Sequence, residues 1–249
     1  MYRLLYFAVV TIAMVIAQPK QSKDDSTDPV PYAPFQASFR SVPGLIHVCS
    51  GSILSGRWIL TAAHCVQGRT VTTTKIVVGS YTINPQGVEY DPAEFHINPN
   101  FDPLFYEHDI ALVRTATDIV LNDDVRVITL PSSVAPAGEL VVLTGWRSDI
   151  AEETPNDMHM ARKVTLDNDE CETIHKEGDS HVEIHVTNVC ARPRMTGCYC
   201  IIDAGAPLAT EELELVGVFS ISAGCGRGLP AAYTRVQSYR SWIATVTGL

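Results

Sequence analysis

Short segments rich in β-branched residues recur along this chain, and glycine, proline, asparagine and aspartate separate them. Valine, isoleucine and threonine fit the pleated surface of a strand, whereas the separating residues favour turns. The segments that we expect to form strands are residues 35–40, 52–54, 58–61, 75–78, 111–114, 140–144, 160–165 and 215–220. Many short strands with turns between them predict an all-β barrel or sandwich.

Helix is expected mainly at the C-terminal end of the chain. Apolar residues recur there at helical spacing, at Val236, Tyr239, Trp242, Ile243 and Val246. The sequence contains no linker and no internal repeat that would indicate further domains. We therefore expect one domain, since all-β barrels often reach about 200–250 residues as a single unit.

The N-terminus has the pattern of a secretory signal peptide. Arg3 precedes an apolar run that ends at Ile16, and the small residue Ala17 provides a cleavage site. The run is too short for a membrane-spanning helix, which needs about 20 apolar residues. We expect a signal peptide over residues 1–17, a polar N-terminal segment over 18–33, and a globular domain over 34–249 that is secreted and extracellular.

Charge and composition exclude several kinds of partner. The formal net charge is −10, so a nucleic acid or an anionic membrane surface is not expected to bind. The histidines are scattered, and neither a Cys-x-x-Cys pair nor a His-Glu-x-x-His motif occurs, so no metal and no cofactor is expected. Seven cysteines in a secreted chain predict a disulfide framework with one thiol left over.

Three motifs point to a family. They are LTAAHC at residues 60–65, HDIALV at 108–113 and CIIDAGAPL at 200–208. In this order they resemble the TAAHC, DIAL and GDSGGP signatures of the chymotrypsin/trypsin family of serine proteases, with the third one altered. The resemblance runs from about residue 34 to 246. It implies a trypsin-like double six-stranded antiparallel β-barrel with a C-terminal helix.

The resemblance also assigns the catalytic positions. His64 matches the general base, Asp109 matches the carboxylate that orients it, and residue 204 matches the nucleophilic serine. That residue is Ala204, whose methyl group has no proton to transfer and no lone pair with which to attack. We therefore expect no active catalytic residues, and we expect His64 and Asp109 to persist as a buried structural hydrogen bond.

The oxyanion hole is altered as well. Two residues before the nucleophile the family has a glycine, whose backbone N–H forms half of this hole, and the present chain has Ile202. A β-branched residue resists backbone angles that glycine adopts readily, so we expect the peptide to turn away from the hole. Loss of one such donor lowers the rate by about 10²–10³.

We expect the primary specificity pocket to be occluded. Its base carries Cys198 with Tyr199 beside it, and its walls carry Ile221, Ser222 and Ala231. These residues are bulkier or less charged than those of an open trypsin-like pocket. The alternative is a pocket retuned for a very small side chain, as in elastase-like enzymes.

Spacing and the family resemblance together imply the disulfide pairing. The expected bonds are Cys49–Cys65, Cys171–Cys190 and Cys200–Cys225. Cys198 is then left over, and we expect it to be a buried, inert thiol.

The family's activation device is missing. Active relatives insert a newly cut N-terminus beside the aspartate that precedes the nucleophile, but residues 22–25 read SKDD and offer no such terminus. Asp203 would then be a buried carboxylate without a partner, which costs several kcal/mol. In zymogens of the family a histidine and a serine fill this role, and His47 and Ser38 match their positions. An exposed His47 is the alternative.

The combined losses resemble the inactivated serine protease paralogues of the scabies mite, which are related to the mite group 3 allergens. This resemblance implies secretion and interference with host complement. We expect a monomeric pseudoenzyme whose partners are proteins, with host complement components as the first candidates. Two alternatives stay open: a non-catalytic cofactor of an arthropod protease cascade, and a residual serine-type endopeptidase.

Overall fold

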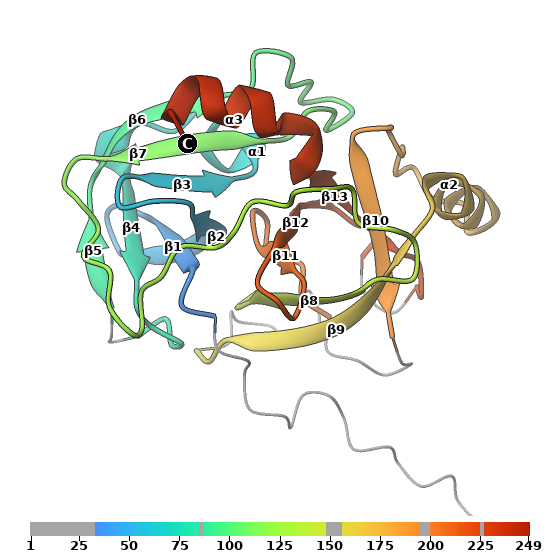
Figure 1. Cartoon of the computed structure of the whole chain (residues 1–249), viewed down its shortest axis with the longest axis horizontal. Helices are drawn as coiled ribbons and strands as arrows, with labels where there is room; N and C mark the ends of the chain where they lie inside the picture. The colour runs from blue at the N-terminus through green and yellow to red at the C-terminus, as the bar shows by residue number, and fades with distance from the viewer. Residues whose placement is uncertain (1–32, 85–86, 148–155, 195–199, 225–226) are drawn as a thin grey trace, which may run out of the picture.

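The computed structural model describes residues 33–84, 87–147, 156–194, 200–224 and 227–249. The expected signal peptide, together with Cys198, Tyr199 and Cys225, lies outside these residues. Figure 1 shows the strands of the N-terminal half on the left and those of the C-terminal half on the right, with the C-terminal helix across the top of the N-terminal half.

The N-terminal half forms a seven-stranded antiparallel sheet with the strand order β5-β4-β1-β2-β3-β7-β6. Its strands are β1 (Gln36–Ser41), β2 (Ile46–Ile53), β3 (Trp58–Thr61), β4 (Thr74–Val78), β5 (Val88–Tyr90), β6 (Pro92–Ile97) and β7 (Ala111–Thr115). Strand β2 pairs with both β1 and β3, so it lies in the middle of this sheet.

The C-terminal half forms a closed barrel with the strand order β10-β13-β12-β11-β8-β9. Its strands are β8 (Leu140–Gly145), β9 (His159–Leu166), β10 (Asn188–Pro193), β11 (Pro207–Ala209), β12 (Leu215–Ile221) and β13 (Ala231–Arg235). The helical elements are α1 (Ala63–Val66), η2 (Val71–Thr73), α2 (Asn168–Glu177), η3 (Val236–Tyr239) and α3 (Arg240–Thr247).

The trypsin-like fold class is confirmed, with two differences in detail. The first sheet has a seventh strand, β5, which is only three residues long and buries only Tyr90, so it leaves little pattern in the sequence. Helix α2 was not expected, because it buries only Cys171 and His175 and therefore lacks a clear apolar stripe.

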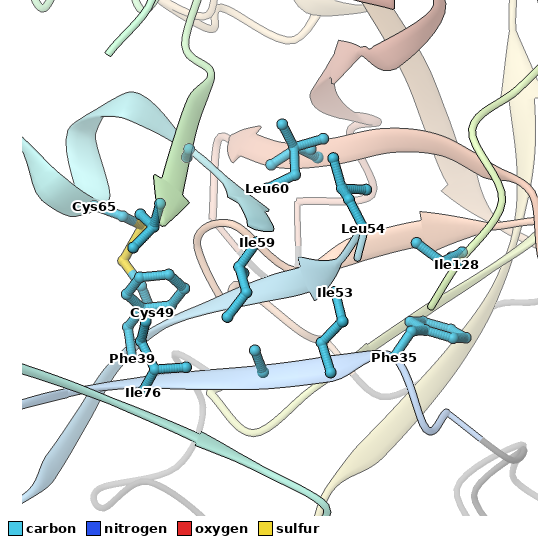
Figure 2. Close-up of a cluster of buried hydrophobic side chains, with 14 of the residues drawn as sticks. Phe35, Phe39, Cys49, Ile53, Leu54, Ile59, Leu60, Cys65, Ile76 and Ile128 are labelled. Atoms are coloured by element: carbon cyan, nitrogen blue, oxygen red, sulfur yellow. A yellow bond between two sulfur atoms is a disulfide. The ribbon is translucent and has the colours of Figure 1, made fainter. Parts of the chain in front are cut away.

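The core of the first sheet fixes the segment that carries His64. Figure 2 shows Phe39 beside the Cys49–Cys65 disulfide, with Ile59 and Ile53 farther along the same buried cluster. Each such fully buried side chain contributes about 1.5–3 kcal/mol. Because the disulfide joins β2 to α1, His64 is anchored to the middle of the sheet.

Buried polar contacts join the two halves. Thr144 Oγ on β8 donates a hydrogen bond of 2.8 Å to Gln36 Oε1 on β1. The Gln36 side-chain amide in turn donates to Ser50 Oγ on β2, at 2.9 Å. Within the described part of the chain, no helix is long and apolar enough to cross a membrane.

Candidate functional site

His64 and Asp109 lie against one another where the two halves meet. The His64 backbone N–H donates to Asp109 Oδ1 at 2.9 Å, and His64 Nδ1 lies 2.7 Å from Oδ2. A carboxylate only accepts hydrogen bonds, so Nδ1 carries the proton. Nε2, on the other side of the ring, takes no part in the contact with Asp109. Ser220 Oγ also donates to Oδ2, at 2.6 Å, and Thr234 Oγ donates to the Asp109 carbonyl. These contacts hold the ring in the orientation of a general base.

The loop that contains Ala204 is tied to both halves. Ser50 N–H donates to the Ala204 carbonyl at 2.7 Å, and Gly205 N–H donates to the Phe219 carbonyl at 2.9 Å. Gly205 has a φ of +77°, and a Cβ at this position would lie 2.2 Å from the Ser50 carbonyl oxygen. Only glycine fits there without strain. Phe219 directly precedes Ser220, whose hydroxyl donates to the Asp109 carboxylate. The loop is therefore bonded to a residue adjacent to one of the partners of Asp109.

Ile202 N–H makes a hydrogen bond within the protein. It donates to the Arg147 carbonyl at 3.0 Å. The Ile202 side chain packs against the apolar core of the second barrel, which holds the residue in place. The amide that would form part of an oxyanion hole is therefore directed at a fixed carbonyl group.

The structure brings together the wall residues expected around the specificity pocket. Ile221, at the end of β12, pairs with Ala232 on β13, next to the buried Ala231. Ser222 follows directly, and its hydroxyl accepts a hydrogen bond from Gly224 N–H at 3.4 Å. The base of the pocket lies outside the described residues, because Cys198 and Tyr199 do, so its occlusion by Tyr199 stays a prediction.

Asp203, His47 and Ser38 form a continuous buried chain. His47 Nε2 lies 3.0 Å from Asp203 Oδ1 and 3.1 Å from Oδ2, and His47 Nδ1 lies 2.8 Å from Ser38 Oγ. His47 is 4% exposed and Asp203 is 0% exposed, so the alternative of an exposed His47 is wrong. The edge of the His47 ring also meets the Trp146 ring, with the centroids 5.1 Å apart.

Two further donors reach Asp203. Ser50 Oγ donates to Oδ2 at 2.9 Å, and Trp146 N–H donates to the same oxygen at 2.8 Å. Burial raises the pKa of the Asp203 carboxyl, but interaction with His47 and the hydrogen bonds from His47, Trp146 and Ser50 outweigh it and hold that pKa below its ordinary value. Sequence reasoning missed both donors. Ser50 lies in the part of β2 that precedes the expected strand at residues 52–54, so no sequence signal indicated its burial.

The disulfides among the described residues match the pairing that the family resemblance implies. The Cys49–Cys65 and Cys171–Cys190 disulfides are present. Cys200 is disulfide-bonded, while its expected partner Cys225 lies outside the described residues. His64 lies near the sulfurs of Cys49 and Cys65, but these sulfurs are bonded to each other and are not thiolate ligands.

Comparison with known proteins agrees with the fold. The family model described as Trypsin matches residues 24–243, so the chain belongs to the trypsin-like family of serine proteases. Chymotrypsin-2 of Vespa crabro is 31% identical to this chain over 84% of its length and 92% of the relative's. Trypsin of Sarcophaga bullata is 31% identical over 84% and 82%, and trypsin 5G1 of Aedes aegypti is 32% identical over 89% and 83%.

Proposed function

We propose that this chain is a secreted, non-catalytic member of the trypsin-like family that acts by binding proteins. Ala204 carries the proposal, because it occupies the position of the nucleophilic serine. His64 and Asp109 keep their mutual geometry, but a methyl group offers His64 no proton to remove. The acyl-enzyme step of a serine protease therefore has no nucleophile.

The surroundings of Ala204 support the same proposal. Ile202 N–H is bonded to the Arg147 carbonyl and not free for an oxyanion. Asp203 is turned toward His47, which is the arrangement that the family resemblance associates with zymogens. Removal of one oxyanion donor alone costs about 10²–10³ in rate. A serine at position 204 would therefore stand in a site that is not organised for catalysis.

The principal test compares the mature protein with Ala204→Ser. We expect no labelling by a fluorophosphonate probe and no turnover of peptide or ester substrates by the wild-type protein. Ala204→Ser should gain at most weak labelling. Turnover that co-purifies with the wild-type protein and disappears in His64→Ala would contradict the proposal and favour a residual serine-type endopeptidase. A fully active Ala204→Ser would show that the rest of the site is intact.

We further propose that the partner belongs to a host proteolytic cascade such as complement. The resemblance to inactivated mite proteases motivates this choice, together with a scaffold that keeps its disulfides and buried core without a nucleophile. One candidate contact region is α2 with the loop that follows it. A cleft of about 480 Å³ opens there, lined by Glu172, His175, Lys176, His181 and Glu183 among others.

The binding proposal is tested in serum. Purified protein should lower complement-dependent lysis in a dose-dependent way, and His64→Ala should act equally well because no catalysis is involved. Replacement of residues 179–183 by a neutral loop of equal length should weaken the effect if this cleft contributes. If the wild-type protein at micromolar concentration changes no complement step and captures no serum protein, the non-catalytic cofactor of an arthropod protease cascade becomes the better proposal.

A further inference from the structure

The loop between β6 and β7 presents two large apolar side chains to solvent from a turn with its own hydrogen bonds. Leu104 is 75% exposed and Phe105 is 46% exposed. The Asp102 N–H donates to the Glu107 carbonyl at 2.9 Å. The Asp102 carboxylate accepts from the N–H of Leu104 at 2.8 Å and from that of Phe105 at 3.4 Å. Because this backbone is already held, docking on these side chains costs little ordering of the loop.

The same turn contacts both His64 and the second half of the molecule. The edge of the Tyr106 ring meets the His64 ring, with the centroids 5.3 Å apart. The next residue, Glu107, has its Oε1 4.0 Å from Nδ1 of His185, which belongs to the loop between α2 and β10. Val186 follows directly in that loop and is 84% exposed. We call three exposed apolar residues the apolar rim: Leu104, Phe105 and Val186.

The loop that carries Val186 belongs to a strongly acidic stretch of the chain. Residues 167–186, which include α2 and form what we call the acidic segment, hold seven aspartates and glutamates against one lysine. Their formal charge is −6, out of −10 for the whole chain. All seven acidic residues are exposed. Helix α2 lies at the outer edge of the molecule, so these charges face solvent (Figure 1).

Few of these charges are neutralised within the described part of the chain. Glu172 pairs with Lys176 at 2.6 Å, and Glu170 lies 3.7 Å from Arg192. Arg227 stands near the C-terminal end of α2, but it donates to backbone carbonyl groups there. The other five acidic residues form no ion pair with another described residue. The acidic segment therefore keeps a negative field on its solvent side.

This combination selects one kind of partner. Protein interfaces bury a few apolar anchors and surround them with polar and charged groups. Here the apolar rim supplies the anchors and the acidic segment supplies the charges, so the complementary surface is apolar with lysine or arginine around it. A second copy of this chain would bring a net charge of −10 and the same acidic segment, and an anionic membrane would be repelled as well.

We propose that the apolar rim and the acidic segment together form a docking surface for a basic polypeptide segment that carries an exposed apolar side chain. This inference rests on the proposed function, because it names the chemistry of the partner that a non-catalytic member of the family binds. It extends the contact region at α2 to the loop between β6 and β7, and the contact between Glu107 and His185 joins the two parts. Electrostatic attraction steers the partner, and burial of the apolar rim holds it.

A synthetic peptide tests the chemistry of this surface. The probe has one phenylalanine and one leucine in its middle and two lysines at each end, and amide NMR follows its binding to the mature protein. We expect a dissociation constant of about 1 mM or lower. The same peptide with glutamate for each lysine, or with alanine for both apolar residues, should bind at least about tenfold more weakly. Raising NaCl from about 50 to about 300 mM should weaken the lysine peptide about threefold, because salt screens exposed charges.

Two double variants test the apolar rim. Leu104→Ser combined with Phe105→Ser should weaken binding of the lysine peptide at least about tenfold. The matched control is Val120→Ser combined with Val127→Ser, which removes two exposed valines between β7 and β8. This control should bind the peptide as the wild-type protein does.

Two further double variants test the charges. Asp179→Asn combined with Glu183→Gln removes two exposed carboxylates of the acidic segment and should weaken binding about threefold. Glu211→Gln combined with Glu212→Gln removes two exposed carboxylates between β11 and β12 and should leave binding unchanged.

Several results would overturn the docking surface. They are no binding of the lysine peptide at about 5 mM, equal binding of the glutamate peptide, or unchanged binding by the double variant at Leu104 and Phe105. Sedimentation of the wild-type protein adds one more. A dimer that this double variant loses would overturn the proposal in favour of a second copy as the partner.

The docking surface and the proposed function can fail separately. Fluorophosphonate labelling and substrate turnover report on the site around Ala204 and not on this surface. In serum, an effect of the wild-type protein that the double variant at Leu104 and Phe105 retains would overturn the docking surface alone. Peptide binding without any effect in serum would support the docking surface and remove complement as the partner.

Discussion

Loss of the His47 imidazole removes the only donor that the described residues provide to Asp203 Oδ1. In His47→Ala, Ser50 Oγ and Trp146 N–H would still reach Oδ2, at 2.9 and 2.8 Å, so the carboxylate would keep two of the three donors that the described residues provide. Ser38 Oγ would lose its contact with Nδ1 at the same time. The perturbation is therefore a partly unpaired buried charge and not a wholly isolated one.

The magnitude follows from this partial loss. Breaking a buried charge pair costs about 3–5 kcal/mol when the remaining charge has no other partner. A single hydrogen bond to a charged group contributes about 1.5–3 kcal/mol. Because Ser50 and Trp146 still donate to Oδ2 while Oδ1 loses its donor, we expect His47→Ala to lower the free energy of unfolding by about 3 kcal/mol.

Urea unfolding followed by tryptophan fluorescence measures this change, and His181→Ala is the matched control. His181 is exposed, so its loss should change the free energy of unfolding by no more than about 0.5 kcal/mol. In an Asp203→Asn background the cost of His47→Ala should fall to about 1 kcal/mol, because no buried charge is left unpaired. The reasoning is refuted if His47→Ala costs less than about 1 kcal/mol, or if its cost is unchanged by Asp203→Asn.

Three further outcomes are expected from the same region. Ser50→Ala should cost about 1.5–3 kcal/mol in urea unfolding, because it removes one hydrogen bond to the buried carboxylate. Gly205→Ala should cost more than about 2 kcal/mol, since φ is +77° and the new Cβ would meet the Ser50 carbonyl; a neutral result would show that the loop can move away. The pKa of the Asp203 carboxyl is held below its ordinary value, so the ionised carboxylate stabilises the fold fully above the unfolded pKa of about 3.9. This stabilisation is lost as the pH falls through the lower pKa of the folded protein. Asp203→Asn should therefore reduce the fall in the free energy of unfolding at acid pH, and an unchanged fall would contradict the assigned direction.

Sequence reasoning located the strands well where two features coincided. Residues 58–61 combine β-branched and aromatic side chains with a flanking turn, and β3 covers the same residues. Strand β2 begins earlier than expected, at Ile46, because its first residues are stabilised by pairing with β1 and not by a local apolar pattern. Tertiary pairing of this kind leaves no trace in a short window of sequence.

The candidate site was predictable where it depends on motifs and unpredictable where it depends on packing. His64 and Asp109 lie in short motifs, so the family resemblance was enough to place them together. Ser50 became part of the Asp203 network only because β2 lies against the loop around residue 203, where the Ser50 amide also donates to the Ala204 carbonyl. Buried polar residues signal that partners exist, but their identity depends on the register of the strands.

The loop from residue 202 to 205 is held by its neighbours at every position. Ile202 N–H is bonded to Arg147, Asp203 to His47, the Ala204 carbonyl to the Ser50 amide, and Gly205 N–H to Phe219. These contacts come from both halves of the molecule, and none involves the side chain at position 204. A serine introduced there would change one side chain while every contact that sets the backbone stays in place. The backbone shape of the loop and the missing nucleophile thus prevent catalysis independently of each other. We therefore expect that a serine at position 204 alone restores little activity.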